Sequence, residues 1–333
     1  MTLTAPESEI SVVIPTYGCR DCMRALHERL TAALASVTPD YEIIFVDDRS
    51  PDGAWEIILE LAREDEHVRA LRLSRNFGQQ ASITAGLAAS RGNWTVVMDC
   101  DLQEPPELIP DLYAKAQEGY DVVFARRRRR NVSRFRTAAA GIYFRFQKVF
   151  LGNDLTGDYA SFSILSRRVR EAFLRIRDQD RHYLPIIRWL GFEQASVDFD
   201  HAPRYAGKSS YTFRRLVQLA IEGVFFQTTA LLVWIVWLGF ALAVSGILLA
   251  LYFLYSYATA NPYPGWTSLA VLLLVIGGFI IISTGVTGLY IGTIFKQVKD
   301  RPLYLVDEEV GGGGASAADG HGPPLADEFT RHP

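Results

Sequence analysis

Hydrophobic and polar residues alternate in blocks along the first 124 residues of the chain. Short apolar runs alternate with longer stretches whose apolar positions have helical spacing, such as 22–34 and 54–63. The runs that we expect to form strands are 10–14, 41–46, 68–73, 94–98 and 120–124. Strands that alternate with helices predict an α/β domain with a Rossmann-like, mostly parallel sheet, which we assign to residues 1–208.

A different pattern fills the C-terminal third of the chain. No Asp, Glu, Lys or Arg occurs from 223 to 295, a stretch of 73 residues. A turn rich in Pro, Gly and Asn divides this stretch into two apolar runs, 230–257 and 266–295. About 20 apolar residues suffice to cross a bilayer, so the pattern predicts a two-helix transmembrane hairpin within 228–297. The alternative is a helical hairpin buried in a soluble core.

Basic residues flank this hairpin only at its outer ends. Arg214 and Arg215 precede it, Lys296, Lys299 and Arg301 follow it, and the connecting turn has none. By the positive-inside rule, both ends lie in the cytoplasm. The first nine residues lack the apolar core of a signal peptide. We therefore expect a multi-pass protein of the plasma (inner) membrane, with its soluble domain and both termini in the cytoplasm.

The segments on either side of the hairpin have patterns of their own. Residues 209–227 place apolar side chains on one helical face and polar ones on the other, which predicts an amphipathic interface helix. The alternative is a helix packed on the soluble domain. Residues 298–333 include four consecutive glycines, and we expect a disordered cytoplasmic tail there.

Composition narrows the functional classes. The 34 Lys and Arg residues nearly balance the 37 Asp and Glu residues, for a formal net charge of −3, so nothing favours a nucleic-acid partner. An aromatic content of 12% excludes disorder outside the tail. Three cysteines are too few for a disulfide scaffold, although Cys19-x-x-Cys22 after the first strand leaves a thioredoxin-like redox pair as an alternative.

Polar residues follow the expected strands, where ligands of parallel sheets gather. Asp47 and Asp48 follow the second strand, and Asp99 and Asp101 follow the fourth. The sequence has no Gly-rich phosphate loop, so a phosphate-bearing ligand would need a metal ion. Carboxylate oxygens in this arrangement suit Mg2+ or Mn2+. An Asp-x-Asp pair taken alone is also typical of a solvated turn.

In their order and spacing, the strand-end motifs resemble those of the family-2 glycosyltransferases with the GT-A fold. They are Pro15-Thr16-Tyr17, Asp47-Asp48-x-Ser50-x-Asp52-Gly53, Arg75-Asn76-x-Gly78 and Asp99-x-Asp101-Leu102-Gln103-x-Pro105-Pro106-Glu107. Two later segments resemble those of the polyprenyl-phosphate glycosyltransferases, a group that includes dolichyl-phosphate mannose synthase and bactoprenol glucosyltransferases. They are Gly157-Asp158-Tyr159 and Arg204-x-x-Gly207-Lys208-Ser209-Ser210-Tyr211.

The resemblance implies a role for each matching residue. The nucleotide pocket would be lined by Pro15, Thr16, Tyr17, Asp47, Asp48 and Asp99. The divalent ion, Mg2+ or Mn2+, would be held by Asp99 and Asp101, with Gln103 close by. The catalytic residues would be Asp101, Asp158 and Arg204, and Ser209 would face the acceptor phosphate. The chain departs from the family pattern at Gly18-Cys19 and at Ser210, which bears on the sugar more than on the reaction class.

The implied reaction is the inverting transfer of a sugar from a nucleotide-sugar donor to a polyprenyl (undecaprenyl) phosphate at the cytoplasmic membrane face. The lipid-linked product would serve cell-surface glycan synthesis or modification, and members of the group sometimes assemble as homo-oligomers. A phosphate monoester has a second pKa of about 6 and is already anionic at neutral pH. Asp158 could therefore orient the acceptor instead of acting as a base.

An anionic acceptor needs cations to bind it. Five consecutive arginines, 126–130, follow the fifth expected strand, and guanidinium groups bind phosphate well. Arg126 and Arg130 are the first candidates for the acceptor phosphate. A solvated basic loop is the alternative for this segment.

Two other functions stay open at this point. A processive polysaccharide synthase typically carries Gln-x-x-Arg-Trp, whereas Pro185 stands at the Gln position ahead of Arg188 and Trp189. A non-catalytic membrane scaffold that kept the fold is the second alternative. The acidic residues retained at the strand ends speak against the scaffold.

Overall fold

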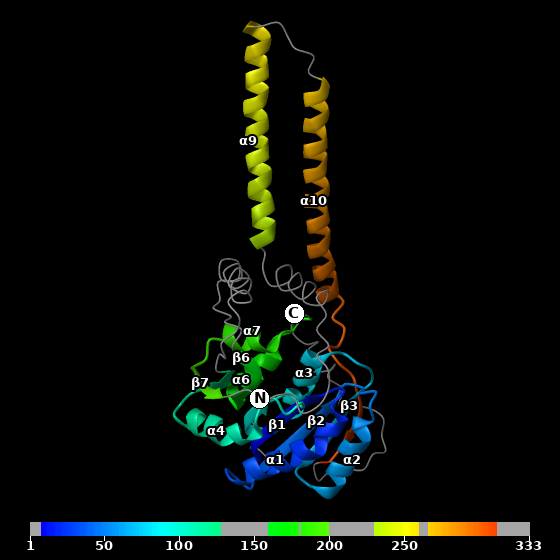
Figure 1. Cartoon of the computed structure of the whole chain (residues 1–333), viewed down its shortest axis with the longest axis vertical. Coiled ribbons are helices and arrows are strands. Elements are labelled where there is room, and N and C mark those ends of the chain that lie inside the picture. The colour runs from blue at the N-terminus through cyan, green and yellow to red at the C-terminus, as the bar shows by residue number, and fades with distance from the viewer. Residues whose placement is uncertain (1–7, 128–158, 180, 200–229, 260–265, 312–333) are drawn as a thin grey trace, which may run out of the picture. The chain divides into compact units, whose positions relative to one another are not determined.

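The structure, a computed structural model, describes residues 8–127, 159–179, 181–199, 230–259 and 266–311. It divides into two units (Figure 1). The sheet unit comprises Met1–Val132, Thr156–Lys208 and Pro302–Pro333, and the helical unit comprises Ser133–Leu155 and Ser209–Arg301.

A single eight-stranded sheet forms the centre of the sheet unit. Its strands lie in the order β7-β5-β6-β4-β1-β2-β3-β8. Their bounds are β1 Ser8–Thr16, β2 Tyr41–Asp47, β3 Val68–Leu73, β4 Gly92–Val97, β5 Val122–Arg127, β6 Tyr159–Ser166, β7 Gln194–Phe199 and β8 Val306–Val310. The four strands β3, β2, β1 and β4 run parallel, and β5 runs parallel to β7. The strands β6 and β8 are antiparallel to their neighbours. The predicted α/β class with a mixed, mostly parallel sheet is confirmed.

Helices cover both faces of this sheet (Figure 1). One face is covered by α1 Met23–Ala35, α2 Ala54–Glu64 and α4 Ile109–Gln117, with the short 3-10 turns η1 Arg20–Cys22 and η2 Pro106–Leu108. The other face is covered by α3 Gln79–Ala89, α6 Arg167–Arg175 and α7 Tyr183–Trp189. A parallel sheet needs this cover on both faces, which explains why its strands read as continuous apolar runs.

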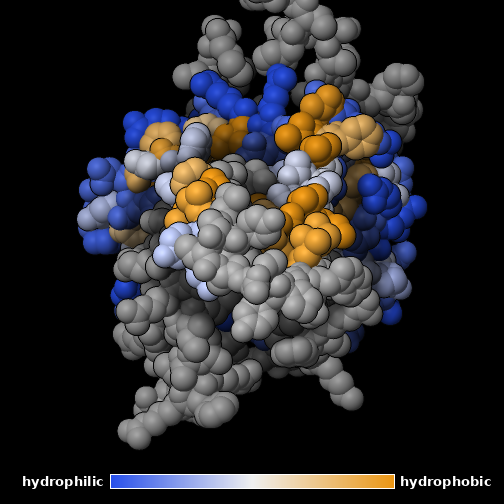
Figure 2. All heavy atoms as spheres, turned by 90° about the horizontal axis from the view of Figure 1, so that it is seen from above, coloured by the Kyte–Doolittle hydropathy of each residue, from blue (hydrophilic) through white to orange (hydrophobic). Residues whose placement is uncertain are grey.

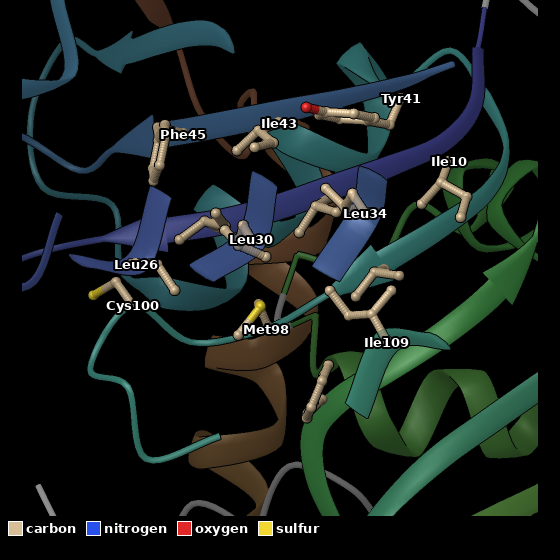
Figure 3. Packing of buried hydrophobic residues seen from close by; sticks show 14 of the residues in the cluster. Ile10, Leu26, Leu30, Leu34, Tyr41, Ile43, Phe45, Met98, Cys100 and Ile109 are labelled. Atoms are coloured by element: carbon tan, nitrogen blue, oxygen red, sulfur yellow. The ribbon is translucent and has the colours of Figure 1, made fainter. Parts of the chain in front are cut away.

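The packing of α1 shows how the sequence pattern becomes a core (Figure 3). Leu26, Leu30 and Leu34 recur every four residues, so they share one face of the helix, and all three are fully buried. They lie in one cluster with Ile10 of β1 and Ile43 of β2. This apolar layer holds β1 and β2 together and so fixes where their carboxyl ends emerge.

The predicted disordered tail at 298–333 is wrong in its first part. Residues 306–310 form β8, which pairs antiparallel with β3 at the edge of the sheet. The strand is held by its backbone ladder and by acidic side chains that meet arginines of β3. Such long-range pairing is invisible to a local reading of an acidic segment. Residues 312–333 lie outside the described part of the chain.

The helical unit contains two long helices at the predicted positions. They are α9 Ala230–Thr259 and α10 Trp266–Val298. Large apolar side chains lie exposed on both of them, including Trp237 and Phe240 on α9 and Ile281 and Phe295 on α10. In the view of Figure 2, apolar residues (orange) lie at the surface of the molecule. Within the described residues one helix, the part of α10 from Ile276 to Val298, is long and apolar enough to cross a membrane. The second span and the amphipathic helix at 209–227 stay predictions, and the latter lies outside the described residues.

Candidate active site

The carboxyl ends of β1 and β2 bring the first two motifs together. Thr16, the last residue of β1, is the register partner of Asp47, the last residue of β2. The backbone N–H of Asp48 donates to the carbonyl of Thr16 at 3.0 Å. Thr16 is buried, whereas Tyr17 directly after it is 52% exposed. The predicted nucleotide-pocket residues of these two strands therefore lie side by side, with Tyr17 open to a ligand.

The carboxylate of Asp47 is fully buried and has few partners to offset the cost of burying its charge. Its Oδ1 accepts the backbone N–H of Ser50 at 3.0 Å, and its Oδ2 lies 3.4 Å from Nε of Arg72. Within the described residues, Oδ2 accepts no hydrogen bond. Burial raises the pKa of Asp47 to about 6, and the Ser50 amide and Arg72 partly oppose that rise. A buried acceptor atom without a donor suits a ligand that brings an N–H group.

The loop after β2 binds the loop after β1 through side chains. Oγ of Ser50 accepts the backbone N–H of Gly18 at 2.7 Å and donates to Asp52 at 2.6 Å. The other oxygen of Asp52 accepts the backbone N–H of Arg20 at 2.9 Å. Gly53 has a φ of +81° just before α2, a conformation that favours glycine. The Ser50-x-Asp52-Gly53 motif thus fixes the shape of both loops.

Asp48 binds the third strand-end loop. Its two oxygens accept the backbone N–H groups of Phe77 and Gly78, at 2.7 and 2.8 Å. Gly78 has a φ of +95°, which only glycine adopts readily. Burial raises the pKa of Asp48, and the two amides oppose the rise. In this structure Asp48 therefore shapes the pocket through the backbone, and its direct contact with a nucleotide stays a prediction.

Asp99 lies at the carboxyl end of β4 with two side-chain donors. Its Oδ1 accepts Nε2 of Gln79 at 2.7 Å and Oγ of Ser161 at 3.2 Å. Its backbone N–H donates to Oε2 of Glu104 at 3.2 Å. The pKa of Asp99 is raised, first by burial and then by the charge of Asp101. The arrangement holds one oxygen of Asp99 firmly and concentrates negative charge beside it.

Asp101 and Gln103 form a tight turn beyond Asp99. Oδ1 of Asp101 accepts the backbone N–H of Gln103 at 3.1 Å. Leu102 between them has a φ of +58°, a left-handed conformation that a leucine rarely adopts. Strained backbone of this kind clusters at ligand sites. Asp101 is two residues from Asp99 in the sequence, and the turn places it at the same strand end.

The donor set of this strand end fits a hard divalent cation. Among the described residues no group of three or more metal-binding side chains occurs. Mg2+ and similar ions are commonly held by one or two carboxylates together with substrate phosphates, so Asp99 and Asp101 suffice on the protein side. Glu104 lies behind them, 1% exposed, and burial raises its pKa to about 8. Its Oε1 has no hydrogen-bond partner within the described residues. Positive charge at this place would relieve the buried acids.

A disulfide joins the two halves of the site. Cys19, after the Pro15-Thr16-Tyr17 motif, bonds to Cys100, which stands between Asp99 and Asp101. The thioredoxin-like pairing of Cys19 with Cys22 is therefore wrong. Cys22 stays unbridged because its side chain is buried in the apolar cluster that also contains Leu26 of α1. The expectation that three cysteines form no disulfide framework did not foresee this single bridge.

Arg126 has an acidic partner in the structure. Its guanidinium forms a bidentate pair with Asp198 of β7, at 2.6 and 3.1 Å. Arg127, the next residue on β5, lies within electrostatic reach of Asp99 and slightly opposes the rise in the pKa of that acid. The acceptor-phosphate role of Arg126 stays a prediction.

Four predicted site residues lie outside the described part of the chain, namely Arg130, Asp158, Arg204 and Ser209. Sequence reasoning also missed residues that the structure brings to the site, namely Arg72, Gln79, Glu104 and Ser161. Gln79 follows directly after the third strand-end motif, and Glu104 sits inside the fourth, so position gave a signal for both. Arg72 and Ser161 gave none, because their importance comes from strand pairing.

Comparisons with known proteins place the chain in a family. Residues 11–174 match the family described as Glycosyl transferase family 2. The uncharacterized glycosyltransferase YkcC of Bacillus subtilis is 32% identical over 305 residues, which cover 91% of this chain and 94% of the relative. The undecaprenyl-phosphate 4-deoxy-4-formamido-L-arabinose transferase of Photorhabdus laumondii is 35% identical over 309 residues, 91% of this chain and 94% of the relative. The solved structure of mannosyl-3-phosphoglycerate synthase from Rubrobacter xylanophilus is similar with a TM-score of 0.46 and 18% identity, over 65% of this chain and 72% of that chain.

A mixed sheet with acidic strand ends, in a chain with these relatives, defines an enzyme that transfers sugars and has a GT-A-like fold. The chain belongs to glycosyltransferase family 2.

Proposed function

We propose that this enzyme transfers a sugar, with inversion, from a nucleotide-sugar donor to a polyprenyl (undecaprenyl) phosphate at the cytoplasmic face of the plasma membrane. The reaction uses Mg2+ or Mn2+, and the product is a lipid-linked sugar. Two transmembrane helices anchor the enzyme beside its lipid substrate, and both termini lie in the cytoplasm.

The observation that carries the proposal is that two acidic strand ends lie close together at one edge of the sheet. Asp47 at the end of β2 and the Asp99-x-Asp101 turn after β4 lie on either side of the end of β1. The Cys19–Cys100 bridge joins the loop after β1 to the turn after β4. A nucleoside diphosphate offers what each end lacks, since its base carries an N–H group for Asp47 and its diphosphate binds a cation held by the other pair.

The donor half of the reaction follows from these positions. Tyr17 is exposed beside Asp47 and can stack on the base, while Oδ2 of Asp47 accepts the N–H of the base. Asp99 and Asp101 would hold the divalent ion, which neutralises charge that develops on the leaving diphosphate. Gln79 and Ser161 keep Asp99 in place through their hydrogen bonds. The side chains therefore bind and orient the donor without taking a proton from it.

The acceptor half is supported by a relative and by charge. The Photorhabdus laumondii relative is named for transfer to undecaprenyl phosphate, and the likeness extends over 91% of this chain. A lipid phosphate is already a nucleophilic anion at neutral pH, so it needs cations and orientation more than a strong base. Arg126, Arg130, Arg204 and Ser209 would contact that phosphate, and Asp158 would orient it.

A transfer assay tests the proposal. Purified full-length protein in lipid would receive undecaprenyl phosphate, Mn2+ and one of a panel of UDP- and GDP-sugars. We expect one donor to yield a lipid-linked sugar of inverted anomeric configuration, with nucleoside diphosphate released in equal amount. The D99N variant serves as the inactive control. No product from any donor, together with no binding of any nucleotide, would contradict the proposal.

A further inference from the structure

Four residues form one row across the edge of the sheet. Thr16 is the register partner of Asp47, Asp47 of Arg72, and Arg72 of Glu308 on β8. The row therefore begins in the donor pocket and ends on the strand that follows the helical unit in sequence. Its last three positions are an acid, a base and an acid, namely Asp47, Arg72 and Glu308.

The side chains of the last three residues of this row contact one another in turn. Nε of Arg72 lies 3.4 Å from Oδ2 of Asp47, and NH1 of the same guanidinium donates to Oε1 of Glu308 at 3.2 Å. The guanidinium also lies over the ring of Trp55 in α2, 5.3 Å from its centroid. Arg72 is thus held on two sides while its Nε faces the buried carboxylate. Among the described residues, Arg72 is the positive group that lies against Asp47 and opposes the rise in its pKa.

A second contact from the same strand reaches the donor loop. NH1 of Arg49 donates to Oδ2 of Asp307 at 2.7 Å. Arg49 follows Asp48 directly and has a φ of +58°, an uncommon conformation for a residue with a side chain. Neighbouring acids of β8 therefore hold two arginines, one beside Asp47 in the sheet and one in the loop that follows it.

We infer that β8 is a working part of the donor site, in which Glu308 positions Arg72 and Arg72 positions the carboxylate of Asp47 for the nucleotide base. Arg72 is a positioning residue, because it acts through Asp47 and touches no substrate itself. Asp307 supports the same loop through Arg49. The inference rests on the proposed function, since it assigns β8 to the nucleotide pocket of that reaction.

The strand offers its own matched control. Glu309 stands next to Glu308 and pairs with Arg69 at 2.9 Å. Arg69 also pairs with Glu42 at 2.8 Å, so it keeps a partner when Glu309 is neutralised. Within the described residues, the hydrogen-bond partners of Arg69 and Glu42 lie outside the loop after β2, namely Ser11, Ala89, Arg91 and Glu309. E308Q and E309Q therefore remove the same charge from the same strand, with and without a route to Asp47.

Nucleotide binding and transfer kinetics of the full-length protein test the inference. Titration of UDP and GDP with Mn2+ by calorimetry gives affinities, and the transfer assay gives KM and kcat for the donor. We expect R72Q to weaken nucleotide binding roughly ten-fold and E308Q about two- to five-fold, as for loss of a partly exposed charge pair. The donor KM should rise by the same factors with kcat nearly unchanged, E308D should recover most of the affinity, and E309Q should match the wild type.

The outcomes separate the inference from the proposed function. Wild-type protein that binds a nucleotide, with E308Q and R72Q binding equally well, would overturn the role of β8 alone. Equal weakening by E308Q and E309Q would also overturn it, because the effect would then be general to the strand. Wild-type protein that binds no nucleotide would overturn both.

Discussion

The carboxylate of Asp48 accepts the backbone N–H groups of both Phe77 and Gly78, so one buried side chain joins the loop after β2 to the loop before α3. The motif after β2 and the motif after β3 are thereby connected through a single residue. The pocket is built as much by acids that hold backbone as by acids that face a ligand.

Replacing Asp48 by asparagine tests this connection. The amide keeps one acceptor oxygen but presents an NH2 group to the second backbone N–H, which leaves that donor unsatisfied. We expect D48N to lower the free energy of unfolding by about 2–3 kcal/mol, the range for lost hydrogen bonds to a charged group. Thermal unfolding of the full-length protein measures it, and D21N, on an exposed position of η1, is the control. Equal midpoints for D48N and D21N would contradict the structural role.

Asp47 predicts a pH-dependent difference between wild type and D47N. Its pKa is raised from 3.8 to about 6 in the fold, so between these values the folded state binds more protons than the unfolded state. Stability contributed by this group therefore falls as pH rises from about 4 to about 6, and stays low above that. The asparagine variant lacks this loss.

The measurement compares unfolding midpoints of D47N and wild type across pH. We expect the stability of D47N relative to wild type to rise by about 2 kcal/mol between pH 4.5 and 7.5, since one pKa unit corresponds to about 1.4 kcal/mol and part of the change already occurs below pH 4.5. Donor binding should be lost in the same variant. A relative stability that does not change with pH would show that Asp47 titrates at its ordinary pKa.

Substitution of Asp101 should change the Mn2+ concentration that the enzyme needs for activity. Its substitution by asparagine removes one of the two charges that we expect to hold the cation, while the amide oxygen can still accept the N–H of Gln103. We expect D101N to raise the Mn2+ concentration for half-maximal activity by roughly ten- to one hundred-fold, and a chelator to abolish wild-type activity reversibly. D111N, on an exposed position of α4, is the control. Full activity of chelated wild-type protein would remove the metal from the mechanism.

The Cys19–Cys100 bridge predicts a redox-dependent stability. The bridge closes a loop with a sequence separation of 81 residues. A disulfide of this kind typically contributes about 2–4 kcal/mol, so reduction should lower the unfolding midpoint measurably. C19S and C100S should be insensitive to reductant, whereas C22S should respond as wild type does. Peptide mapping without reductant should recover Cys19 and Cys100 in one linked product, and two separate alkylated peptides would exclude the bridge.

The sequence predicted the strands that build their own core. The run 41–46 is apolar except for Glu42 and becomes β2, which is buried along its whole length. The spacing of Leu26, Leu30 and Leu34 likewise predicts α1 correctly. Local hydrophobicity specifies these elements because each one buries a face that is visible in its own residues.

The strands β6, β7 and β8 were not predicted, and for β8 the reason is physical. Residues 306–310 contain three consecutive acids, which are disfavoured in strands taken alone. They form a strand because Arg69 and Arg72 stand opposite them on β3. The same argument applies to the site, where strand-end position identified Asp47, Asp99 and Asp101, whereas Ser161 reaches Asp99 only through the pairing of β6 with β4.

The place of β8 sets an order of events while the protein is being made. β3 leaves the ribosome early, and 232 residues separate its last residue, Leu73, from the first residue of β8. At about 5–20 residues per second, the outer edge of β3 stays open for roughly 10–50 seconds, during which both long helices are synthesised. Open edges invite pairing with other chains, and arginines such as Arg69 and Arg72 discourage it. The edge of the sheet at β3 is therefore closed only after both long helices have been synthesised, and a protein truncated ahead of α9 would carry a permanently open edge that favours aggregation.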